Sequence, residues 1–231
     1  MVLVVVALLT TALSANWIWS KADAVAPVAL PSAKSGPMKT VNPSASPTTT
    51  RPPEGKVVGT NLVASNNDTM PLMSSVWGDY YEQTGLYGGA AIWLTVHDKY
   101  DGKSSWGNYV SFGQLPASIP FKNTPAGLKD AAASAGGMAL NRLYSDGQKK
   151  APAPYAVTRR PITVNGHAGF EITGRIPVKK PKLKETYSVI MIAVIDRGDG
   201  TAAVSIGDFA GSAPQWLPVW RTKVSQIKIG G

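Results

Sequence analysis

The two histidines of the chain are its first candidates for acid–base or metal chemistry. His167 follows Asn165-Gly166 and precedes Glu171, whereas His97 lies much earlier, beside Asp98. Asn-Gly favours a tight turn because both residues tolerate positive φ, so we predict that His167 is a surface residue at a hairpin. No short ligand spacing supports a metal shared by the two histidines. We therefore predict no metal centre and no cofactor.

The sequence lacks the common signatures of catalysis. The chain has no cysteine, which excludes disulfides, thiol nucleophiles and zinc sites with thiolate ligands. It contains no Gly-x-Ser-x-Gly elbow, no GxGxxG and no GxxxxGK[ST], the signatures of serine hydrolases and of nucleotide-binding loops. We predict a non-enzymatic binding or interaction protein. The alternatives are a cell-wall-associated hydrolase that uses Asp98, Asp101 or His97, and a subunit of a larger envelope complex.

The DRGDG segment at 196–200 has alternating acidic residues, as a calcium-binding loop does. It lacks the later ligands of a twelve-residue calcium site. Because it lies between two apolar runs, we predict that it forms a hairpin turn.

Aromatic residues are concentrated between positions 77 and 109, where glycines could let a flat ligand approach closely. Core packing is the favoured interpretation, because large aromatic side chains also fill protein interiors. The alternative is a ligand site for sugars or other flat molecules. Its candidate residues are Trp77, Tyr81, Trp93 and Trp106.

Positive charge is concentrated in the second half of the chain. The net charge is +9, and from Lys149 onward there are 13 Lys and Arg against 5 Asp and Glu. The segment VKKPKLKE at 178–185 offers a contact for an anionic partner, or alternatively a soluble hairpin tip. No aromatic residue interrupts this run to stack on bases, so nucleic acid is not favoured. The candidate contacts are Lys179, Lys180, Lys182 and Lys184.

The N-terminal segment predicts attachment to a membrane. Residues 1–19 contain no charged side chain, and about 20 apolar residues span the hydrocarbon layer as a helix. A secretory signal peptide is the alternative, because Ala22-Asp23-Ala24 has the small-x-small form of a cleavage site. We predict a transmembrane anchor at 1–20, a disordered Pro/Ser/Thr-rich linker at 21–55 and an extracytoplasmic domain at 56–231. The expected partners are the membrane and a protein or cell-wall component.

Hydrophobic periodicity predicts the elements of that domain. Thr124 and Pro125 are favourable at a helix N-terminus, and apolar residues then recur at helical spacing until Gly147. A shorter helix is predicted around Trp216 and Trp220, with Ser212 near its cap. Strands are predicted at 85–97, 108–112, 170–176, 187–195 and 202–206, with a last strand at 227–229. The predicted fold class is α+β, an antiparallel β-sheet flanked by helices.

The order of elements in the C-terminal half resembles the PsbP-like fold. The resemblance rests on Val164-Asn165-Gly166-His167-Ala168 at the start of a strand and on the Trp-bearing helix before the last strand at 216–229. That fold occurs in an extrinsic photosystem II subunit, a Ran-binding import factor and actinobacterial envelope proteins. The resemblance implies an α/β/α sandwich that binds or assembles with partners without catalysis. It transfers no functional residue, because no site motif matches.

Overall fold

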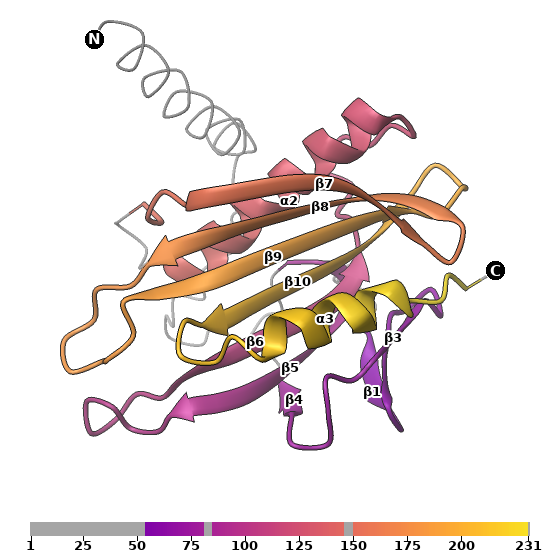
Figure 1. Ribbon diagram of the computed structural model, residues 1–231. Helices are drawn as coiled ribbons and strands as arrows, with labels where there is room; N and C mark the ends of the chain where they lie inside the picture. Colours follow the sequence, from indigo (N-terminus) through magenta and orange to yellow (C-terminus); the bar gives the residue numbers. More distant parts are fainter. Residues whose placement is uncertain (1–53, 81–84, 146–149, 231) are drawn as a thin grey trace, which may run out of the picture.

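A seven-stranded antiparallel sheet forms the centre of the domain in the computed structural model, which describes residues 54–80, 85–145 and 150–230 (Figure 1). Its strand order is β4-β5-β6-β10-β9-β8-β7. The strands are β4 (Gly78–Tyr80), β5 (Tyr87–His97), β6 (Trp106–Gln114), β7 (Tyr155–Val164), β8 (His167–Pro177), β9 (Tyr187–Asp196) and β10 (Ala202–Ala210). The central strands β9 and β10 are almost wholly buried, as strands covered on both faces must be.

The helix α2 (Pro125–Tyr144) packs on β8 and β9 and covers one face of the sheet. Its buried positions are mainly Ala, together with Gly136 and Gly137. These small side chains bring the helix axis close to Ile172 and Ile192, which belong to the same core cluster. The small residues of α2 therefore allow the helix to pack closely against the sheet.

The opposite face is covered by the helix α3 (Trp216–Ser225) and by a second, three-stranded antiparallel sheet (Figure 1). The strands of this sheet are β1 (Lys56–Val58), β2 (Asn61–Val63) and β3 (Thr69–Pro71). Trp220 is fully buried between α3 and β10, and its indole N–H donates to Ser205 Oγ at 3.1 Å. Leu62 and Met70 bring the small sheet into the same core.

The start of α2 is stabilised as its sequence predicts. The Thr124 hydroxyl accepts a hydrogen bond from the Gly127 N–H at 3.0 Å, and Pro125 occupies the first turn. We expect Thr124→Ala to lower the free energy of unfolding by about 1 kcal/mol, because that N–H loses its partner. Urea denaturation measures the change, and Thr124→Ser should keep most of the stability. Equal losses in the two variants would contradict the capping role.

The predicted fold class is wrong in its architecture. The described chain is mostly β, with two antiparallel sheets and two helices, rather than an α/β/α sandwich with a helical layer on each face. The error arose because β1, β2 and β3 have three residues each, too few to show a period. In addition, β7 contains Arg159-Arg160-Pro161 and follows a Pro-rich segment, so its sequence does not show the pattern of a strand. Pro is acceptable in β7 because the strand lies at the sheet edge.

Several element predictions are confirmed and two are not. The predicted strands at 108–112, 170–176, 187–195 and 202–206 fall within β6, β8, β9 and β10, and the one at 85–97 begins two residues before β5. The predicted last strand is reduced to a single bridge between Thr69 and Lys228. The N-cap of α3 is Gln215 rather than Ser212.

The predicted anchor at 1–20 and nearly all of the predicted linker at 21–55 lie outside the described residues. Within the described ranges, no helix is both long and apolar enough to cross a membrane.

Candidate functional site

His167 belongs to a hairpin and has a structural role. Asn165 and Gly166 both adopt positive φ between β7 and β8, and His167 is the first residue of β8. Its ring Nδ1 lies 2.9 Å from the backbone carbonyl oxygen of Asp196. This ring nitrogen therefore donates to the neighbouring hairpin, and His167 is half-buried there rather than fully exposed.

The Glu171 carboxylate, close to His167 in sequence, is also structural. It lies buried between Arg160 of β7, at 2.8 Å, and Arg221 of α3, at 2.9 Å. Burial disfavours the ionised carboxylate, but the two guanidinium groups outweigh that effect and hold the pKa of Glu171 below its ordinary value. The three side chains connect α3 to the edge of the main sheet.

His97 makes a contact that the sequence did not predict. Its Nε2 lies 2.8 Å from Glu185 Oε1, and Glu185 also accepts hydrogen bonds from the backbone N–H and the hydroxyl of Ser212. Burial opposes ionisation of Glu185, yet these hydrogen bonds hold its pKa below the ordinary value. The carboxylate stands between serine and histidine, so His97 is not placed to take a proton from Ser212 as a triad histidine does.

The carboxylates proposed for a hydrolase lie in the turn between β5 and β6. Asp101 accepts hydrogen bonds from the N–H groups of Lys103 and Ser104, which lower its pKa. Asp98 accepts a hydrogen bond from the Ser105 hydroxyl at 2.7 Å. Both side chains are exposed and organise the turn. Elsewhere in the described part of the chain, no cluster of three or more His, Cys, Asp or Glu could hold a metal ion.

The candidate aromatic residues do not form one site. Trp77 is buried and packs edge-on against Phe209 and Trp216, with ring centroids 6.4 and 5.3 Å away. Trp93 stacks on Tyr80, with ring centroids 5.4 Å apart. Tyr81 lies outside the described residues. Of the other three, Trp106 lines the pocket described next, whereas Trp77 and Trp93 are absent from its lining.

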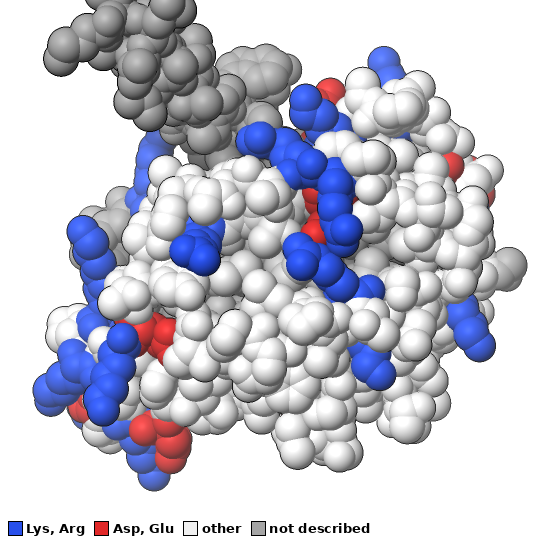
Figure 2. All heavy atoms as spheres, in the orientation of Figure 1, with Lys and Arg blue, Asp and Glu red and all other residues white. Residues whose placement is uncertain are grey.

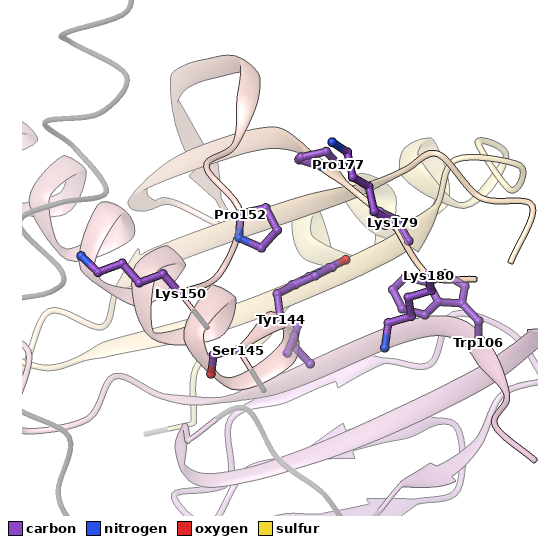
Figure 3. A pocket seen from close by; sticks show the side chains of 10 residues that line it. Trp106, Tyr144, Ser145, Lys150, Pro152, Pro177, Lys179 and Lys180 are labelled. Atoms are coloured by element: carbon purple, nitrogen blue, oxygen red, sulfur yellow. The ribbon is translucent and has the colours of Figure 1, made fainter. Parts of the chain in front are cut away.

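That pocket has a volume of about 470 Å³ and lies at the C-terminal end of α2 (Figure 3). In the view of Figure 3, Tyr144 stands between Lys180 on one side and Ser145 and Lys150 on the other. The walls come from β6, α2, the segment after α2, and the connection from β8 to β9. The lining residues are Trp106, Leu143, Tyr144, Ser145, Lys150, Pro152, Pro177, Val178, Lys179 and Lys180.

The four candidate lysines are divided by this pocket. Lys179 and Lys180 line it, whereas Lys182 and Lys184 are exposed and absent from its lining. The Lys180 ammonium lies 5.3 Å from the centroid of the Trp106 ring, within the range of a cation–π contact. Figure 2 shows blue Lys and Arg atoms gathered, with a few acidic ones, near the end of the sheet where the β5–β6 and β8–β9 connections lie.

Tyr144 connects the pocket to a buried carboxylate. Its ring packs edge-on against Trp106, with centroids 6.3 Å apart, and its hydroxyl lies 2.8 Å from both carboxylate oxygens of Asp208. Burial raises the pKa of Asp208 to about 7, although the hydrogen bond from Tyr144 lowers it in part. Burial and the neighbouring Asp208 also raise the pKa of Tyr144, so the phenol stays protonated and donates to the carboxylate.

Comparison with known proteins assigns no family. No protein family and no curated protein matches the sequence. One solved structure gives a weak match, a Pseudomonas aeruginosa protein of unknown function, PA94, described as a candidate regulator. It is 11% identical with a TM-score of 0.34, and the match covers 63% of this chain and 92% of that one.

Sequence reasoning found Trp106, Lys179 and Lys180 but assigned them to two separate hypothetical surfaces. It missed Tyr144, because a tyrosine as the last residue of a helix is not part of any recognised motif. Pro152 and Pro177 also gave no signal of a site, since they lie in segments that resemble connections. A weak signal did exist: Leu143 and Tyr144 are large residues that end a helix otherwise rich in alanine and glycine.

Proposed function

We propose that the domain is a non-enzymatic binding module that holds a small ligand in the pocket beside Trp106 and Tyr144. The pocket itself carries this proposal. Its volume of about 470 Å³ falls within the roughly 300–1,000 Å³ that is typical of small-molecule sites. Two aromatic rings, two prolines and apolar side chains offer contact area, and polar groups stand around them.

The chemistry of the lining favours binding over hydrolysis. A hydrolase of the type considered above needs a carboxylate or a histidine beside the reacting atom, to transfer a proton. The ten lining residues include neither. These candidate residues already have hydrogen-bond partners: His97 contacts Glu185, and Asp98 and Asp101 accept hydrogen bonds within the β5–β6 turn. Attachment to a membrane and an extracytoplasmic location stay predictions from the sequence, and the binding proposal does not depend on them.

A neutral ring compound tests whether the pocket binds ligands. We expect indole-3-acetamide to shift the amide resonances of residues around Trp106 and Tyr144 in ¹H–¹⁵N spectra of the domain. Trp106→Ala should raise the dissociation constant about fivefold or more, because a stacking surface is lost. Trp93→Ala is the matched control, since Trp93 is also partly exposed but lies outside the lining. Shifts that map elsewhere, or equal effects of the two variants, would refute the proposal.

A further inference from the structure

We infer that the ligand of this pocket is a small organic anion with a flat ring, whose negative group meets Lys179 and Lys180 while its ring packs beside Trp106 and Tyr144. This inference rests on the proposed function and adds the chemical class of the ligand. It is carried by the arrangement of charge, ring surface and hydrogen-bond donors in the lining.

The charged groups of the lining all have one sign. Three lysines and no acidic residue are among its ten members. Lys179 and Lys180 are exposed, and neither forms an ion pair with an acidic side chain of the described residues. Their charges are therefore not neutralised locally, and a ligand that carries a carboxylate, sulfonate or phosphate would supply the missing counter-charge.

The position of Lys180 joins the charge to the ring surface. Its ammonium lies over the Trp106 ring, 5.3 Å from the centroid, so a cation is positioned directly beside the aromatic surface of the pocket. Because this contact already restricts the Lys180 side chain, the side chain loses less conformational entropy when a ligand binds. A ligand that places a ring within the pocket thus brings a short acidic substituent near the ammonium group.

The buried carboxylate that contacts Tyr144 does not oppose an anion strongly. Asp208 is absent from the lining, and the Tyr144 hydroxyl that covers it donates to both of its oxygens. Because burial raises its pKa to about 7, Asp208 is partly protonated at neutral pH. The Tyr144 ring is therefore available for packing, while its polar end is already satisfied.

A pair of compounds that differ only in charge tests the inference. We expect indole-3-acetate to bind the domain about three- to tenfold more tightly than indole-3-acetamide at low salt, as two exposed charge contacts allow. Isothermal titration calorimetry measures both constants. Raising the salt from about 20 mM to about 300 mM should reduce the preference, because exposed charges are screened.

Two double variants that remove the same number of positive charges test which lysines contact the negative group of the ligand. Lys179→Gln/Lys180→Gln should abolish the preference for the acetate, so that the acetate loses about three- to tenfold more affinity than the amide. Lys182→Gln/Lys184→Gln, in the same connection but outside the lining, should keep most of the preference. Equal losses in the two variants would show a general effect of net charge and would overturn the inference.

The two compounds also separate failure of the inference from failure of the proposed function. If both bind at Trp106 with equal affinity, the pocket is a ligand site but does not select anions. If neither compound shifts any pocket resonance, the proposed function fails together with the inference. A preference for the amide would overturn the anionic class directly.

Discussion

Replacing Arg197 with Met is expected to lower the free energy of unfolding by about 3–5 kcal/mol, because it leaves the carboxylate of Asp68 buried without its cation. Asp68 is fully buried, and Arg197 Nε donates to its Oδ2 at 2.9 Å. Only 11% of the Arg197 side chain is exposed, so water cannot easily replace the guanidinium.

The same contact joins three distant parts of the chain. The Gly230 N–H donates to Asp68 Oδ1 at 2.7 Å, and the Gly230 carbonyl accepts from Arg197 Nη2 at 3.0 Å. The turn between β2 and β3, the hairpin between β9 and β10, and the C-terminal segment are thereby held together. The DRGDG segment is thus a hairpin turn, as predicted, and its arginine has a structural role.

Urea denaturation of Arg197→Met measures this effect, and Arg175→Met is the matched control. Arg175 is exposed and lies over the Tyr187 ring, so we expect its loss to cost less than about 1 kcal/mol. Adding Asp68→Asn to Arg197→Met should restore part of the stability, because the unpaired buried charge is removed. A loss in Arg197→Met no larger than that in Arg175→Met would contradict the argument.

The parts of the fold that the sequence predicts are those in which an element has a strong local signal over several residues. β5 alternates near its end, β9 is continuously apolar, and α2 has a strong N-terminal signal. The small sheet β1-β2-β3 gives no such signal, because each strand is three residues long and its stability comes from packing on the main sheet. The edge position of β7 likewise hides its pattern, because edge strands tolerate polar residues and proline.

The candidate site could be predicted only as separate pieces, for a related reason. Trp106 begins β6, Tyr144 ends α2, and Lys180 lies between β8 and β9. Each is ordinary in its local context, and only the long-range packing of α2 across the sheet brings them together. Asp208, the buried partner of Tyr144, could not be predicted either. The sequence of a short apolar strand does not indicate which helix residue will contact an aspartate within it.

Replacing Asp208 with Asn is expected to change how the stability of the domain depends on pH. Folded Asp208 keeps its proton up to a pKa of about 7, whereas the ordinary value is 3.8. Between these values the folded state binds more protons than the unfolded state, so the contribution of Asp208 to stability falls as the pH rises. The loss is about 1.4 kcal/mol per pH unit, or about 4 kcal/mol in all. Above about pH 8 it is complete.

Asparagine has no such titration, so the difference in unfolding free energy between Asp208→Asn and the unaltered protein should shift in favour of the variant by about 4 kcal/mol from pH 4 to pH 8. Urea denaturation at intervals of pH measures the shift. Tyr144→Phe provides a second test, because the lost hydrogen bond normally lowers the pKa of Asp208. In that variant the fall in stability should extend to higher pH. Parallel profiles for Asp208→Asn and the unaltered protein would show that the carboxyl group ionises in the folded domain as freely as in the unfolded chain.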